Sequence, residues 1–143
     1  MALEATIIVL FGGAGDLAWR KLIPSLFDLH REGRMPEQFA ILAVDRLPFR
    51  DEELRKRFLG GVQQFARNKK FKKADWTAFA RHVTYQQGDF QNPATYSNLE
   101  TTCARMEKAW KAKARRIFHL ATPPGMVAIT RKLVTAFCTT VVS

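Results

Sequence analysis

The chain has 143 residues, 47% of them hydrophobic, a length and composition typical of one folded domain and not of a disordered segment. No stretch approaches the roughly 20 apolar residues of a membrane span, and the N-terminus lacks the pattern of a signal peptide. The two cysteines, Cys103 and Cys138, stand in no zinc-binding pattern, so we expect a reduced, cytoplasmic protein without a metal site.

Much of the formal net charge of +10 lies between Arg50 and Lys73 and suggests an anionic partner or an acidic neighbouring surface. A solvated helix face followed by a basic loop is one interpretation of this segment. Nucleic-acid binding is another, but no helix-turn-helix, RNA-recognition or zinc-finger pattern accompanies the charge. We therefore expect neither a nucleic acid nor a membrane as partner.

Strand-like and helix-like segments alternate along the chain. Residues 6–11 are β-branched and apolar throughout, which predicts a strand buried on both faces. Residues 15–32 carry an apolar stripe at helical spacing, and we expect Pro24 to bend this helix and Gly33 to end it. Further strands are predicted at 39–44, 83–87 (nearer an edge), 116–121 and 139–142. Further helices are predicted at 51–67, 76–80, 92–113 and after Pro124 to about 137, with a basic loop at 69–74.

This alternation predicts a parallel sheet with right-handed crossovers. We therefore expect an α/β fold, a Rossmann-type doubly wound parallel sheet. Residues 1–143 would form one dinucleotide-binding domain that is cut at about the fifth strand.

A glycine-rich turn connects the first strand to the first helix. In it Gly12, Gly15 and Ala18 have a variant of the dinucleotide-binding spacing. The first permits a tight turn, the second lets the backbone approach a pyrophosphate, and the third lets the helix pack closely on the sheet. Amides at the helix N-terminus would then face the phosphates, with about 0.3–1 kcal/mol from the helix dipole. A turn without a ligand is the alternative. The candidate cofactor-binding residues here are Gly12, Gly13, Ala14, Gly15, Asp16 and Leu17.

Asp45 and Arg46 follow the second predicted strand, where this fold meets the adenosine ribose. A carboxylate there accepts hydrogen bonds from the ribose hydroxyls of NAD, whereas an arginine pairs with the 2′-phosphate of NADP. Adjacent side chains at a strand end diverge, so only one should face the ribose. We expect Arg46 to do so, with NADP as the cofactor. NAD binding, and an ordinary exposed arginine, are the alternatives.

The segment 11–26, FGGAGDLAWRKLIPSL, resembles the N-terminus of the glucose-6-phosphate dehydrogenase family, which has a glycine turn followed by Asp-Leu-Ala, a basic residue, Lys-Leu and Pro-Ser. Arg46 matches the family's 2′-phosphate-binding arginine. Residues 88–90 and 120–124 match two further turns beside the cofactor. The resemblance adds Asp89, Phe90, Ala121, Thr122 and Pro123 as cofactor-binding residues, and Lys21 as a residue near the substrate or cofactor.

The resemblance implies an enzyme of the oxidative pentose phosphate pathway that oxidises glucose 6-phosphate to 6-phosphogluconolactone with NADP. The family's catalytic motifs lie beyond Ser143, as does the second α+β domain with its homo-oligomer interface. We therefore expect an inactive cofactor-binding part of such an enzyme, with glucose 6-phosphate a partner only of the full-length protein. Its stability should be low, with Phe118, Phe137 and Val141 exposed.

A noncatalytic module that binds or senses NADP is the alternative function. This alternative predicts an authentic stop codon after Ser143 and a soluble product, whereas the enzyme interpretation predicts that the reading frame continues.

Overall fold

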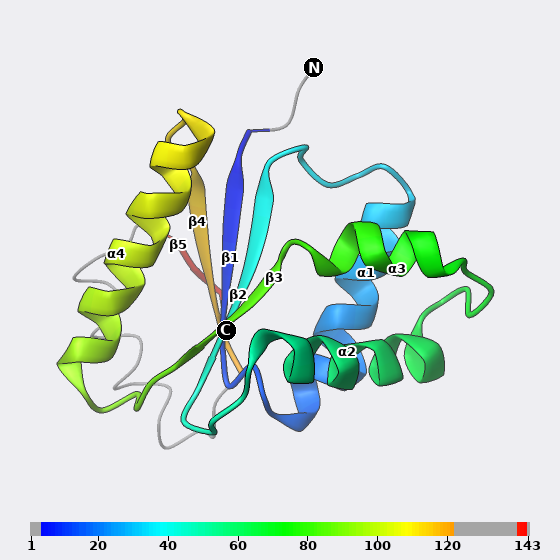
Figure 1. Ribbon diagram of the computed structural model, residues 1–143, viewed down its shortest axis with the longest axis horizontal. Coiled ribbons are helices and arrows are strands. Elements are labelled where there is room, and N and C mark those ends of the chain that lie inside the picture. The colour runs from blue at the N-terminus through cyan, green and yellow to red at the C-terminus, as the bar shows by residue number, and fades with distance from the viewer. Residues whose placement is uncertain (1–3, 122–139, 143) are drawn as a thin grey trace.

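The computed structural model describes residues 4–121 and the backbone of residues 140–142. Within them, five parallel strands form one sheet in the order β3-β2-β1-β4-β5 (Figure 1). The strands are β1 (Thr6–Phe11), β2 (Phe39–Asp45), β3 (Val83–Gln87), β4 (Arg115–Leu120) and β5 (Thr140–Val142). The helical elements are η1 (Ala18–Leu22), α1 (Ile23–Arg31), α2 (Asp51–Phe65), α3 (Lys73–Ala80) and α4 (Pro93–Trp110). In this part of the chain no helix has the length and apolar character that a membrane crossing requires.

β1 is the central strand, as its continuous apolar sequence predicts. It pairs in parallel with β2 and β4, and Thr6 lies opposite both Phe39 and Arg115. Five of its six residues are buried. β3 pairs with β2 alone among the described strands, which agrees with its expected position near an edge.

Helices cover both faces of the sheet, so the fold is the doubly wound α/β arrangement that the sequence predicts. Figure 1 shows α1, α2 and α3 on one side of the strands and α4 on the other. Side chains alternate along each strand and supply two apolar cores. Leu10 and Ile41 belong to the core beneath α1, α2 and α3, whereas Val9 and Leu42 belong to the core beneath α4.

The first helix differs from the single bent helix expected at 15–32. Its start is a wide π-helical turn, η1, in which the amide of Ile23 donates to the carbonyl of Ala18, five residues back. Pro24 then falls in the first turn of α1, where its missing N–H is not needed. A change of helix type therefore accommodates this proline. Gly33 has a φ of 70° just after the helix, which confirms it as the stop.

Two other helix boundaries differ by three residues from the expected ones. α3 begins at Lys73 and not at 76, because the carboxylate of Asp75 accepts the amide of Lys72 at 2.9 Å and caps the helix. The basic loop is correspondingly shorter. α4 ends at Trp110, three residues earlier than expected, since Lys111 adopts a left-handed backbone with a φ of 55°.

The expected exposure of Phe118 is wrong. Its side chain is only 4% exposed, and its ring stacks on that of Phe11 with 5.9 Å between centroids. On this face of β4, Phe118 shares its core with Tyr96 and Leu99 of α4. Phe137 lies outside the described residues, as does the side chain of Val141.

An ion cluster fastens α4 to β4. The guanidinium of Arg116 donates to Glu100 and to Glu107, both on α4. Glu107 also accepts the amide of Ala114 at 2.8 Å. Burial would raise the pKa of Glu107, but the hydrogen bonds from Arg116 and Ala114 outweigh it and lower this pKa below its ordinary value. The carboxylate of Glu107 is therefore ionised at neutral pH.

Candidate functional site

The predicted site residues come together at one edge of the sheet. β1, β2, β3 and β4 are parallel, so the turns that follow them meet at the carboxyl edge, at the lower end of the strands in Figure 1. Open α/β sheets bind their ligands outside this edge. Main-chain hydrogen bonds tie these turns to one another and position their side chains.

The glycine turn is held tightly against the end of β2. Gly12 has a φ of 85°, which favours glycine, and this confirms its expected role in a tight turn. The amides of Gly12 and Gly13 both donate to the carbonyl of Val44, at 2.9 and 3.2 Å, and the amide of Gly15 donates to Gly12 at 2.9 Å. These amides therefore shape the turn and have their acceptors within the protein.

Gly13 has a packing role that the fingerprint spacing does not reveal. A Cβ at this position would lie 2.5 Å from the Cβ of Ala43 and 2.9 Å from its Cα, so the turn touches β2 directly. Ala18 is fully buried, in agreement with its expected close packing. The sequence does not show that the turn packs on Ala43 of β2. The need for a glycine at position 13 could therefore not be predicted from it.

Asp45 links the glycine turn, β2 and β3. Its Oδ2 accepts the amide of Ala14 at 3.1 Å, and its Oδ1 accepts the amide of Arg46 at 2.8 Å. Its main-chain carbonyl accepts the amide of Gly88 at 2.9 Å and the hydroxyl of Tyr85 at 2.9 Å. The carboxylate therefore points to the glycine turn, whereas Arg46 is exposed.

The start of the first helix offers the open amides of the site. Among residues 4–121, the amides of Asp16 and Leu17 donate a hydrogen bond to no protein group, as expected of the first amides of a helix. The carboxylate of Asp16 forms an exposed ion pair with Arg20 at 3.0 Å. Leu17 is 40% exposed, unusual for a large apolar side chain in this structure. Of the residues predicted to bind the diphosphate, these two are open to a ligand.

The turn after β3 lies next to the glycine turn. Phe90 packs edge-on against Phe11, with 5.8 Å between ring centroids. The carbonyl of Asp89 accepts the hydroxyl of Thr95 at 2.6 Å, and its carboxylate accepts the amide of Gln91 at 2.9 Å. Asp89 is itself exposed. Both predicted residues of this turn are thus at the carboxyl edge.

The remaining predicted residues are only partly described. The amide of Ala121 donates to Phe11 at 2.8 Å, which holds the turn after β4 beside the end of β1. Thr122 and Pro123 lie outside the described residues. Lys21 is exposed in η1, on the first helical segment as expected.

Two of the histidines lie far from this edge. The ring of His82 stacks on Phe39 at 3.8 Å, and its Nδ1 is hydrogen-bonded to the carbonyl of Phe39 at 2.8 Å. The ring of His30 lies 5.9 Å from that of His82. Burial lowers the pKa of both below the ordinary value. Since Phe39 begins β2, this pair lies at the amino edge and packs there.

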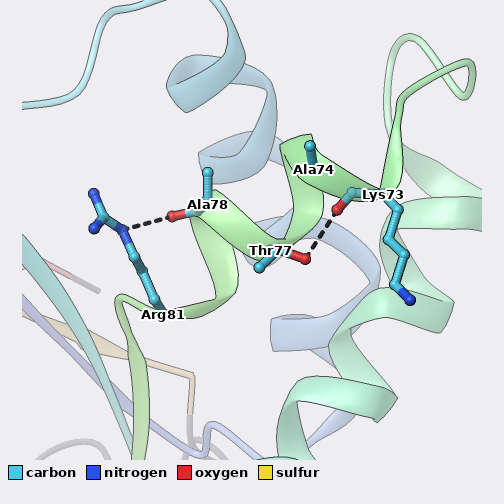
Figure 2. Close-up of a pocket in the computed structure, with 5 residues that line it drawn as sticks. All are labelled: Lys73, Ala74, Thr77, Ala78 and Arg81. Carbon is cyan, nitrogen blue, oxygen red and sulfur yellow. Dashed lines mark hydrogen bonds between the residues drawn. The ribbon is translucent and has the colours of Figure 1, made fainter.

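The outer side of α3 carries a shallow hollow, which Figure 2 shows with its lining residues Lys73, Ala74, Thr77, Ala78 and Arg81. The hydroxyl of Thr77 donates to the carbonyl of Lys73 at 3.0 Å, and Nε of Arg81 donates to that of Ala78 at 3.3 Å. The side chains of Thr77 and Arg81 are thus bonded to main-chain carbonyls of α3, and the third polar side chain, that of Lys73, points away from them (Figure 2). The hollow gathers no converging polar groups, in contrast to the carboxyl edge.

The sequence is similar to a known family along most of its length. A family model described as "Glucose-6-phosphate dehydrogenase, NAD binding domain" matches residues 9–141. The glucose-6-phosphate 1-dehydrogenase of Bacillus subtilis (strain 168) is 35% identical over 129 residues, which cover 88% of this chain and 25% of the relative. That of Chlamydia muridarum (strain MoPn / Nigg) is 31% identical over 118 residues, which cover 82% of this chain and 23% of the relative. The chain thus spans about a quarter of the length of these curated relatives.

Solved structures are similar as well. A structure of glucose-6-phosphate dehydrogenase in complex with its substrate glucose-6-phosphate has a TM-score of 0.84 and 28% sequence identity, over 98% of this chain and 29% of that chain. The crystal structure of glucose-6-phosphate 1-dehydrogenase from Mycobacterium avium has a TM-score of 0.74 at 23% identity, over 92% of this chain and 27% of that chain, and shows the fold alone. These similarities confirm the expected Rossmann-type fold.

Proposed function

Because the chain belongs to the glucose-6-phosphate dehydrogenase family through its NAD-binding domain, we propose that residues 1–143 form the dinucleotide-binding domain of such an enzyme and hold the diphosphate of NADP. The observation that supports this most is the start of the first helix, where the amides of Asp16 and Leu17 are open at the carboxyl edge. Their position suits an anion, which the helix dipole favours further. The other amides of the turn stiffen it and fix the direction of these two.

The proposed adenosine site lies between the turns after β2 and β3. Arg46 is the proposed partner of the 2′-phosphate, because its exposed guanidinium can form a charge-assisted pair there. Asp89 and Phe90 would line the same side, and Ala121 would lie beside the end of β1. Thr122 and Pro123 stay proposed cofactor-binding residues. Lys21 is proposed to lie near the substrate or the cofactor.

The longer protein would transfer hydride from C1 of glucose 6-phosphate to NADP and give 6-phosphogluconolactone. In this reaction the residues of this chain bind and orient the cofactor, and a positioned substrate and a general base must be supplied as well. We therefore expect the 143-residue chain alone to bind the dinucleotide without oxidising glucose 6-phosphate. A relative from Arabidopsis thaliana named as cytoplasmic, 29% identical over 136 residues, supports a cytoplasmic location.

Replacing Arg46 by alanine is expected to weaken NADP binding about 10- to 100-fold, the loss of one charge-assisted pair. NAD lacks the 2′-phosphate, so its affinity should change less than about twofold. Isothermal titration calorimetry of the chain with each dinucleotide measures both. Arg34→Ala is the matched control, since Arg34 is exposed just after α1 and before β2 begins, away from the carboxyl edge. If Arg46→Ala leaves NADP affinity intact, the assignment of the 2′-phosphate to Arg46 is wrong.

A further inference from the structure

The carboxylate of Asp45 is fixed on the ribose side of the proposed site. Each of its oxygens accepts one main-chain amide, from Ala14 and from Arg46, and the residue's carbonyl is held by Gly88 and Tyr85. The bond to Ala14 joins residues 31 positions apart and holds the side chain over the glycine turn. The charge of Asp45 therefore has a defined position at the carboxyl end of β2.

A fixed carboxylate in this position treats the two dinucleotides differently. An ionised carboxylate has about four acceptor positions, and two remain once the amides of Ala14 and Arg46 are bound. Those two can accept ribose hydroxyls, which NAD has at both the 2′ and the 3′ position. NADP has a phosphate at the 2′ position, and its negative charge is repelled by the carboxylate at contact distance.

The neighbouring arginine acts in the opposite direction. Arg46 is exposed and attracts a 2′-phosphate, whereas Asp45 is fixed by hydrogen bonds and cannot turn away without releasing Ala14. In the proposed site the two residues would therefore act on the 2′ position with opposite charges, Asp45 from the side of the glycine turn and Arg46 from the solvent side. A site with only the arginine would select NADP strongly, and a site with only the carboxylate would select NAD.

We propose that Asp45 is a specificity-determining residue that lowers the affinity for the 2′-phosphate, so that the site accepts NAD as well as NADP. This proposal rests on the proposed function, because it needs a dinucleotide at the carboxyl edge. It adds that the bound carboxylate, and not Arg46 alone, sets the ratio of the two affinities.

The test compares ADP-ribose with 2′-phospho-ADP-ribose, which differ only in the phosphate concerned and need no contact to nicotinamide. Isothermal titration calorimetry gives the ratio of the two dissociation constants for the chain and for Asp45→Asn, which keeps the shape and removes the charge. The expected result is a shift of this ratio towards 2′-phospho-ADP-ribose by about tenfold. Asp45→Ser, which also removes the charge, should shift the ratio in the same direction.

Asp75→Asn is the matched control. Its carboxylate also accepts a main-chain amide, that of Lys72, but it lies beside the end of α1 near Asp28 and Glu32, at the amino side of β2. The ratio should not change in this variant. Circular dichroism verifies that each variant is folded.

The outcomes separate the two claims. If the chain binds both probes and the two Asp45 variants leave the ratio within twofold of the original, this inference is overturned and the proposed function stands. If the unmodified chain binds neither probe, the proposed function is overturned, and this inference with it.

Discussion

Gly61→Ala is expected to lower the free energy of unfolding by at least about 3 kcal/mol, at the upper end of the cost of overpacking a core. α2 crosses the wide turn η1 at this glycine, with no room for a side chain. A Cβ here would lie 2.0 Å from the carbonyl oxygen of Trp19 and 2.9 Å from its carbonyl carbon. These are main-chain atoms, so the two helices would have to move apart. Denaturant unfolding followed by circular dichroism measures the loss.

The neighbouring glycine provides the control for Gly61→Ala. Gly60 lies in the same helix and is exposed, and a Cβ at its position would meet no atom within 4 Å apart from its chain neighbours and the nearby backbone of α2. Gly60→Ala should therefore stabilise the protein by about 0.5–1 kcal/mol through helix propensity. Equal and small effects of the two substitutions would mean that α2 does not cross η1 as described.

Arg116→Ala is expected to cost about 3 kcal/mol, because it leaves two carboxylates of α4 without their cation. The side chains of Arg116 and Glu107 are only 16% and 14% exposed, so water replaces the lost partner poorly. Glu100 is 42% exposed and should contribute less. Chemical denaturation at neutral pH, where the carboxylate of Glu107 is ionised, measures the effect.

Two further variants separate the role of the charge from that of the residue's size. Arg115→Ala removes an adjacent but exposed arginine and should change stability by less than about 0.5 kcal/mol. Arg116→Met combined with Glu107→Gln removes both of these largely buried charges and should recover most of the loss, since the carboxylate of Glu107 is then no longer left without its cation. A cost below about 1 kcal/mol for Arg116→Ala would show that the cluster does not hold α4 to β4.

Local sequence patterns were sufficient to predict most of the architecture. The continuous apolar run of β1 indicates a central parallel strand, and the positive φ of Gly12 and Gly33 is what their positions predict. The turns expected to bind a cofactor do follow β1, β2, β3 and β4. These features depend on residue type and spacing along the chain, which the sequence displays directly.

Features that depend on contacts across the fold were not predictable. The pattern of 15–32 shows a helix with a proline, but not that a wide π turn would absorb it. The burial of Phe118 depends on α4, and the tight contacts of Gly13 and Gly61 depend on which element crosses them. Divergence of adjacent side chains indicated that Asp45 and Arg46 would separate, but the amide of Ala14, which draws the carboxylate to the turn, is 31 residues away.

A crystal structure of the chain with NADP tests the central claim most directly. The account predicts diphosphate oxygens within about 3.2 Å of the amide nitrogens of Asp16 and Leu17, with the turn from Gly12 to Gly15 unchanged. A dinucleotide bound on α3 or elsewhere, with those two amides facing solvent, would contradict it.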